Sequence, residues 1–198
     1  DQSASGTFSG LTWSDAFTDV QDALTWQASG PVEGWVAAGT YLPTSYPDPN
    51  STTDPRDRSF HLDTDMKIYG GFAGTETTLS DRDPAVNLTI LSGDFDSNDD
   101  FDAGNGGYQN NTGDDNAYHV FITRSLSNDS ELDGFYIRGG NANWHHSITY
   151  GGLVFSADSG GGMYNSASSP TVTNCTFSGN RASNDGGGMY NSASSPMV

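Results

Sequence analysis

The sequence predicts an all-β protein in which short strands stack in successive coils, a parallel β-helix or solenoid. The main observation is an internal repeat: the eleven residues 160–170, GGGMYNSASSP, return unchanged as residues 186–196. The two copies are 26 residues apart (186 − 160 = 26), and a period of roughly 20 to 50 residues indicates a solenoid, propeller or array. The composition supports this, because 25 glycines with abundant Asn, Ser and Thr suit a narrow interior with many turns.

The residues between the two copies favour strands over helices. Only Val172, Cys175 and Phe177 are large and apolar there, and no run reaches helical length. Short β-type segments separated by Gly, Asn, Ser and Pro are typical of strands joined by tight turns. One coil then holds about three strands, and coils stack in parallel at roughly 4.8 Å. We therefore expect Met163 to pair with Met189, Tyr164 with Tyr190, and Asn165 with Asn191.

Two motifs resemble those of a known group. Gly161-Gly162-Met163 and Phe177-Ser-Gly-Asn180 are similar to the GGA-hydrophobic and FxxN motifs of chlamydial polymorphic outer-membrane proteins, and more broadly to secreted bacterial right-handed β-helix proteins of the pectin-lyase-like superfamily. Segments 35–41, 68–76 and 132–135 resemble the N-terminal part of that group. The resemblance implies a right-handed β-helix and an extracellular or cell-surface location. Adhesins, lyases and structural fibres share this fold, so it does not fix the function. Met163 and Met189 depart from the small residue of the motif and predict a bulkier interior position.

Length and charge narrow the class of protein. A chain of 198 residues can form one domain with a core of its own, here residues 1–198. The 25 acidic residues outnumber the 7 basic ones, giving a net charge of −18. This balance argues against nucleic acid or an anionic membrane as a partner, because it offers no basic patch for phosphate. No apolar run approaches the length of a membrane span, so no membrane insertion is expected. The chain opens on a small polar segment typical of a mature N-terminus.

The single cysteine excludes an internal disulfide framework. Cys175 lies on a predicted strand, and we expect its thiol to point inward.

The first 27 residues are expected to form a lead-in and a helix that covers the first coil of the stack. Residues 1–13 are small and polar and predict an extended lead-in. Residues 14–27 predict an amphipathic helix with Ser14 as its N-cap and with Phe17, Val20 and Leu24 on one face. Such a helix would cap the first coil, whose apolar end and strand edges must be covered. A partner-binding helix is the alternative.

The coils are predicted over residues 35–198, with insertions at about 42–58, 92–117 and 141–158. Segments 35–40, 60–62, 66–69, 88–91 and 119–123 predict strands, and 75–83 a polar excursion. Residues 132–137 align with 172–177 at an offset of 40, so about fourteen residues (40 − 26 = 14) are inserted between them. Long insertions cost little loop-closure entropy and commonly carry the binding surface of a solenoid.

An acidic loop is the first candidate site. Carboxylates or an amide recur at every second position from 94 to 102, at Asp94, Asp96, Asn98, Asp100 and Asp102. Several hard oxygens on one loop are what calcium needs, so calcium is the expected cofactor. The pattern resembles the opening of an EF-hand loop, without its sixth-position Gly, its twelfth-position Glu or its flanking helices. Asp114 and Asp115 could add ligands. A solvated acidic loop is the alternative.

A second candidate site combines aromatic and imidazole groups: Trp144, His145, His146 and Tyr150. Adjacent histidines on a strand point to opposite faces, so they do not share one metal. An aromatic surface that stacks on a glycan or contacts a partner is the functional interpretation, and exposed loop residues are the alternative.

Catalysis is not indicated. Polysaccharide-active enzymes need a cluster of carboxylates with a base, or two facing acids, but the seven basic residues are scattered singly along the chain. The first hypothesis is a non-catalytic extracellular structural or adhesive module; the alternative is a carbohydrate-active β-helix, either lyase-like or glycan-binding.

The last coil suggests self-association or a longer parent chain. Residues 186–198 would leave an open parallel edge, which natural chains cover. We expect a neighbouring lead-in carrying Phe8, Leu11 and Trp13 to cover Met189, Tyr190 and Val198, which would build a fibre. A host surface or glycan is the other partner considered.

Overall fold

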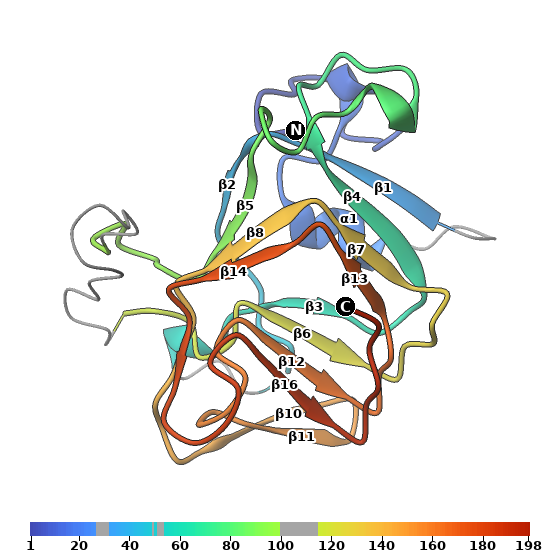
Figure 1. Cartoon of the computed structure of the whole chain (residues 1–198). Helices are drawn as coiled ribbons and strands as arrows, with labels where there is room; N and C mark the ends of the chain where they lie inside the picture. The colour runs from blue at the N-terminus through green and yellow to red at the C-terminus, as the bar shows by residue number, and fades with distance from the viewer. Residues whose placement is uncertain (27–31, 49, 51–53, 100–114) are drawn as a thin grey trace.

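The computed structural model describes residues 1–26, 32–48, 50, 54–99 and 115–198. It is built mainly of strands in parallel sheets, with one short α-helix and three 3-10 turns among the described residues (Figure 1). The turns are η1 (Trp13–Asp15), η2 (Pro55–Asp57) and η3 (Leu79–Asp81). Within these ranges, no helix has the length and apolar character needed to cross a membrane.

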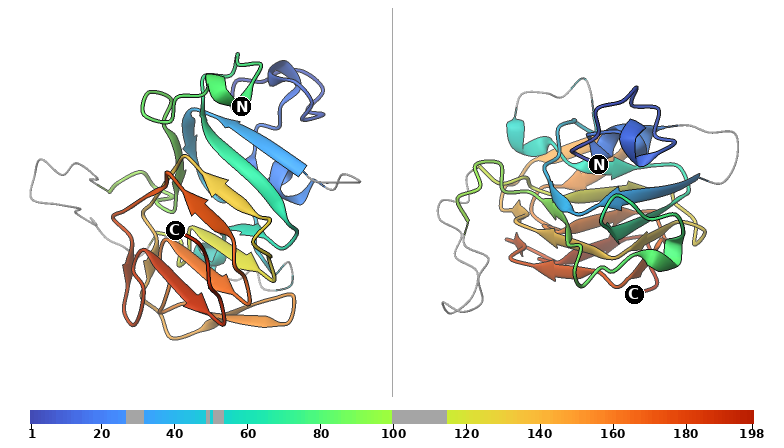
Figure 2. Two further views of the ribbon diagram at one scale, coloured as in Figure 1. Left: turned by 45° about the vertical axis from the view of Figure 1, so that its right-hand side comes forward. Right: turned by 90° about the horizontal axis from the view of Figure 1, so that it is seen from above.

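Three four-stranded parallel sheets form the body of the molecule, and the chain visits them in a fixed cycle. Sheet A consists of β1 (Val32–Ala37), β4 (Met66–Phe72), β7 (Glu131–Asp133) and β13 (Thr171–Thr173). Sheet B consists of β2 (Gly39–Tyr41), β5 (Thr89–Ser92), β8 (Phe135–Arg138) and β14 (Thr176–Ser178). Sheet C consists of β3 (Phe60–Leu62), β6 (Phe121–Arg124), β12 (Met163–Ser166) and β16 (Met189–Ser192). Two short strands, β9 (Asn141–Ala142) and β15 (Arg181–Ala182), pair in parallel between sheets B and C. Seen from above, the strands lie in stacked layers (Figure 2).

The register predicted from the repeat is confirmed. Met163, Tyr164 and Asn165 are the direct partners of Met189, Tyr190 and Asn191 in the parallel pair β12 and β16. The 40-residue alignment is confirmed too, since Leu132 pairs with Val172 and Ile137 with Phe177. The turn after three of the four sheet C strands, β6, β12 and β16, also repeats, because Ser125, Ala167 and Ala193 all adopt a positive φ between 48° and 59°.

The core is a set of side-chain columns that run across the sheets. In sheet C the inward column is Phe60, Phe121, Met163 and Met189; in sheet A it is Ile68, Leu132 and Val172; in sheet B it is Leu91, Ile137 and Phe177. Met163 is fully buried, so the bulky interior position expected from the sequence exists. The Cys175 thiol packs against the same core, as expected.

A polar column lies inside sheet C beside the apolar one. Buried Thr123 donates through Oγ1 to Oδ1 of Asn165 (2.5 Å), and Asn165 Nδ2 donates to Oδ1 of Asn191 (2.8 Å). Each amide therefore finds its partner in the neighbouring coil, which removes the desolvation cost of an unpaired buried group.

The insertion predicted at 141–158 forms a hairpin on the outer face of sheet C. Strands β10 (Ser147–Tyr150) and β11 (Leu153–Ser156) pair antiparallel. Ile148 and Phe155 bury themselves against Ile122 and Tyr164 of sheet C. Sheet C is thus covered on both faces.

The predicted capping helix is shorter than expected. Helix α1 spans Val20–Thr25, with Asp19, rather than Ser14, as its N-cap. Ser14 lies in η1, and Ala16 leaves that turn in an extended conformation (ψ 153°), which ends any continuous helix. The prediction failed because tertiary hydrogen bonds from the lead-in to residues 14–17 hold this segment out of helical geometry.

Helix α1 nevertheless covers part of the first coil. Val20 and Leu24 join the core, and Gln21 closes the edge of β3. Gln21 Nε2 donates to the carbonyl of His61 (3.1 Å), and the N–H of His61 donates to Gln21 Oε1 (3.0 Å). The side-chain amide therefore replaces a neighbouring strand at this position.

The lead-in of residues 1–13 is folded back rather than extended. The N–H of Gly6 donates to the carbonyl of Ser14, and that of Gly10 to the carbonyl of Asp15. Thr7 N–H donates to the Asp15 carboxylate (2.7 Å). The folded segment lies beside the loop of residues 73–88, above the sheets in Figure 1.

Candidate functional site

A groove of about 580 Å³ lies at the end of the stack, between the N-terminal segment and β1. This volume is within the usual range for ligand sites. Its apolar lining consists of Leu11, Trp13, Ala16, Phe17, Val20, Ala23, Trp26, Val32, Trp35, Val36 and Met66. The groove exists because α1 has only six residues and covers β3 more completely than β1. The end of the core therefore remains partly open.

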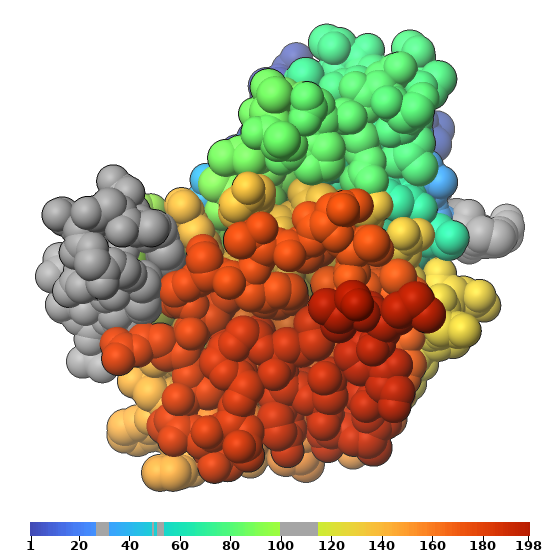
Figure 3. All heavy atoms as spheres, in the orientation of Figure 1, coloured from blue at the N-terminus to red at the C-terminus, as the bar shows by residue number. Residues whose placement is uncertain are grey.

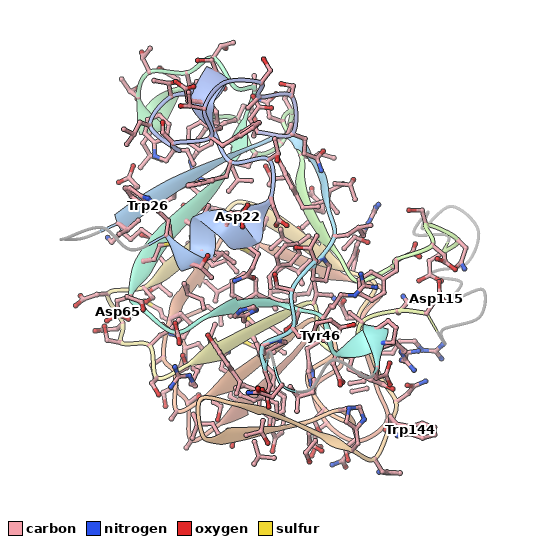
Figure 4. The ribbon with its side chains drawn as sticks, turned by 180° about the vertical axis from the view of Figure 1, so that it is seen from behind. Asp22, Trp26, Tyr46, Asp65, Asp115 and Trp144 are labelled. Carbon is pink, nitrogen blue, oxygen red and sulfur yellow. The ribbon has the colours of Figure 1, made fainter. Side chains whose placement is uncertain are left out.

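The indole rings of the groove are fixed by contacts from three segments. Trp35 stacks on Phe72 with ring centroids 4.7 Å apart and an interplanar angle of 10°. Trp13 tilts against both rings, and its Nε1 donates to the carbonyl of Glu76 (2.9 Å). Trp26, which ends α1, is 41% exposed and lies between α1 and β1 (Figure 4). Two indoles are thus held rigidly, and the third is open to a ligand.

Strand β1 runs along the groove with one edge uncovered. It is the end strand of sheet A, pairing with β4 alone, and five consecutive residues, 32–36, line the groove. Among the described residues, the main chain from Val32 to Trp35 forms hydrogen bonds with no element other than β4. Alternate N–H and C=O groups of such a strand face away from the sheet.

Four carboxylates surround the apolar lining: Asp1, Asp19, Glu33 and Glu76. Asp19 caps α1, and Glu33 accepts from Trp35 Nε1 (2.5 Å). Partial burial opposes ionisation of Glu76, but the N–H groups of residues 73–75 bond its carboxylate and hold its pKa below the usual value. In the described chain no salt bridge reaches Asp19, Glu33 or Glu76, and no Lys, Arg or His lines the groove.

This arrangement suits the binding of groups that are both apolar and cationic, because aromatic rings beside carboxylates attract such groups.

The predicted acidic loop is only partly described, because Asp100, Asp102 and Asp114 lie outside the described residues. Asp94 is buried and accepts from the N–H groups of Asn98 and Asp99, both at 3.2 Å. Asn98 Nδ2 donates to Asp115 (3.1 Å), so the structure brings Asp115 to this loop. Asp96 is exposed and does not join them. Burial raises the pKa of Asp94, and the charges of Asp99 and Asp115 act in the same direction.

Of the described members of the alternating pattern, Asp94 and Asn98 are joined by a hydrogen bond, and Asp96 is exposed. Among the described residues, no group of three or more His, Cys, Asp or Glu side chains is arranged to hold a metal ion.

The residues of the second predicted site have separate partners. His146 Nε2 lies 2.7 Å from Asp57 Oδ1, and its ring edge contacts Tyr118. His145 lies 3.7 Å from Asp158, so the two histidines do point apart. Tyr150 packs against His61 and Phe155 and beneath Arg124. Trp144 is 59% exposed and lies at the opposite corner of the molecule from Trp26 (Figure 4). These four side chains therefore do not form one continuous aromatic surface.

The residues predicted to assemble neighbouring chains are also divided. Trp13 packs inside the chain, whereas Leu11 is 74% and Phe8 46% exposed. Met189 and Tyr190 are half-buried on β16, at the end of sheet C, and Val198 is exposed. The C-terminal segment that contains these residues, 186–198, lies on the face that is coloured red in Figure 3.

The half-buried Cys175 and the buried His119 show no nucleophilic or basic activation. Burial raises the pKa of the Cys175 thiol to about 11, so it stays protonated at neutral pH. Burial lowers the pKa of His119 to about 4, and its Nδ1 donates to the carbonyl of Gly160 (3.0 Å).

The aromatic groove was missed from the sequence because its parts come from the lead-in, α1 and β1, which only the folded chain brings together. A usable signal existed, since three of the four tryptophans fall within residues 13–35. No family model, no curated protein and no solved structure matches this chain.

Proposed function

We propose that this protein is a non-catalytic extracellular structural or adhesive module, a right-handed parallel β-helix that binds through the groove at its N-terminal end. The cyclic order of sheets A, B and C supports a solenoid, and parallel strands joined by crossovers are almost always right-handed. The single observation that carries the binding role is the groove itself, whose three indoles and uncovered strand edge form a contact surface.

An extracellular location rests on the resemblance of the Gly-Gly-Met and Phe-Ser-Gly-Asn segments to secreted β-helix proteins. The chain's acidity agrees with a protein that works in solution and meets cationic or neutral partners.

Glycan binding is the second candidate, because Trp26 presents an exposed ring in a groove with two further indoles. Aromatic faces of this kind also bind the apolar face of a sugar ring. A carbohydrate-active enzyme is less well supported, since the aromatic rings of the groove account for binding but do not assign an acid or a base to a glycosidic bond.

The binding role is tested by adsorption of residues 1–198 to three kinds of bead. The beads carry an unfolded, alkylated basic protein, an unfolded acidic protein, or cellulose. We expect the protein to adsorb to at least one kind of bead, and we expect Trp26→Ala to reduce that adsorption severalfold. The matched control is Trp144→Ala, because Trp144 is equally an exposed indole but lies outside the groove; it should adsorb as the unmodified protein does.

Equal adsorption of both variants would contradict the role of the groove. Trp26-dependent adsorption to cellulose alone would favour the glycan candidate, and new reducing ends released from polysaccharide would contradict a non-catalytic function. Light scattering on the same preparations tests self-association through Leu11 and β16: a monodisperse monomer that Leu11→Ser leaves unchanged would contradict it.

A further inference from the structure

We propose that the groove binds an extended peptide segment rich in basic and apolar residues, which adds to β1 as an additional strand of sheet A. The proposal rests on the binding role given above to this groove and names its ligand. Three independent features of the groove point to this ligand: the free strand edge, the apolar opening and the carboxylates.

The first feature is the difference between the two strand edges at this end of the stack. The edge of β3 is closed by the amide of Gln21, which bonds both the N–H and the C=O of His61. The edge of β1 has no such cover among the described residues, although it is longer, with six residues. An added strand would pair with these main-chain groups and supply affinity that does not depend on its sequence.

The second feature is the opening into the core beside that edge. Val20, Val36 and Met66 are buried members of the core, and all three line the groove. Successive side chains of a strand point to opposite faces, so every second residue of an added strand would face this opening. An apolar side chain there would complete the column that α1 leaves unfinished.

The third feature is charge. Glu33 and Lys67 are neighbours across β1 and β4, but the salt bridge of Lys67 is formed with Glu131 (3.6 Å). Glu33, Asp19 and Glu76 therefore lie along the groove with no salt-bridge partner among the described residues. Lys or Arg side chains on the ligand would meet these carboxylates and the ring faces of the indoles. An acidic segment would be repelled.

Fluorescence anisotropy of a labelled six-residue peptide, (Lys-Val)₃, tests the proposal on residues 1–198. We expect saturable binding that weakens with salt, because exposed charges are screened, and no binding of (Glu-Val)₃. A peptide N-methylated at alternate residues keeps the same side chains but loses the N–H donors of one edge. It should bind at least about tenfold more weakly if strand pairing supplies more than about 1.4 kcal/mol.

Two variants locate the site. Glu33→Gln should weaken (Lys-Val)₃ binding about threefold or more, whereas Asp185→Asn, an exposed carboxylate on the last coil, should leave it unchanged. Melting curves of both variants confirm folding. Competition by spermine as strong as that by the peptide, or equal binding of the N-methylated peptide, would overturn strand addition and leave a simple amine site. If (Lys-Val)₃ fails to bind while adsorption still depends on Trp26, this inference is wrong and the proposed binding function stands.

Discussion

Single polar residues inside the stack are tolerated because the neighbouring coil supplies their partners. Thr123, Asn165 and Asn191 satisfy one another across three strands. The sequence predicted the alignment of Asn165 with Asn191 from the repeat alone, but not the contribution of Thr123, which belongs to no repeat copy. His119 differs from this column, because its Nε2 has no hydrogen-bond partner among the described residues.

His119 gives a pH-dependent prediction. Its folded pKa is about 4 against an unfolded value of about 6.5. Between these values the unfolded chain binds a proton that the folded chain does not, so stability falls as the pH drops from about 6.5 to about 4. The full effect is about 3 kcal/mol, and above pH 6.5 the contribution is constant.

Urea unfolding between pH 4 and pH 7 measures this effect in His119→Asn, whose amide can still donate to the Gly160 carbonyl. The variant should show a flatter dependence of the unfolding free energy on pH. His145→Asn is the control, since the side chain of His145 is 88% exposed. An unchanged slope in His119→Asn would show that His119 does not stay neutral in the folded protein.

Whole elements were predictable where they repeat and less so where they cover the repeats. Strands β12, β13, β14 and β16 follow from local pattern and spacing, because each coil imposes its register on the next. The position of the 141–158 insertion also followed from the sequence, because the 40-residue offset between segments 132–137 and 172–177 exceeds the 26-residue period. Helix α1 did not, since the apolar stripe over residues 14–27 competes with hydrogen bonds from the lead-in, and a sequence pattern contains no information on these contacts.

The hairpin of β10 and β11 should contribute to the stability of the whole chain. Phe155 is fully buried and lies edge-on to Tyr164, with ring centroids 5.1 Å apart. We expect Phe155→Ala to lower the unfolding free energy by about 3 to 5 kcal/mol, as measured by urea denaturation.

Val154→Ala is the matched control on the same strand, because Val154 faces solvent and is 57% exposed. It should change the unfolding free energy by less than about 0.5 kcal/mol. Equal, small effects of both substitutions would mean that the hairpin separates from sheet C in solution.

At the scale of the whole molecule, the net charge of −18 is a source of self-repulsion that cations relieve. We propose calcium as the cation with the most specific effect, bound at the acidic loop predicted from the sequence, where Asp94 is buried and Asn98 donates to both Asp94 and Asp115.

Millimolar calcium should raise the melting temperature, and a chelator should lower it again. At a free concentration one hundred times the dissociation constant, the gain in unfolding free energy is about 2.7 kcal/mol. Asp94→Asn should lose most of this gain, whereas Asp185→Asn should keep it, each compared with sodium chloride of equal ionic strength. A calcium effect no larger than that of sodium chloride, or an equal effect in both variants, would contradict a specific site.

The identical sequences of β12 and β16 have a consequence for the order in which the coils form their strand pairs. Both strands read Met-Tyr-Asn-Ser, and β12 pairs with β6 through the same residues by which β16 could do so. A chain that paired β16 with β6 would place the same side chains on Phe121, Ile122 and Thr123 and leave 26 residues looped out. Strand chemistry therefore does not distinguish the two arrangements.

The native arrangement is distinguished by the shorter loop between β6 and β12, which costs less closure entropy than the loop between β6 and β16 would. The lateral contacts of Tyr164 with the hairpin also distinguish it. Chain length between strands thus encodes the order of the coils, so the gain or loss of one whole repeat would be nearly silent. A single residue inserted within a strand would instead turn the inward side chains of that strand outward.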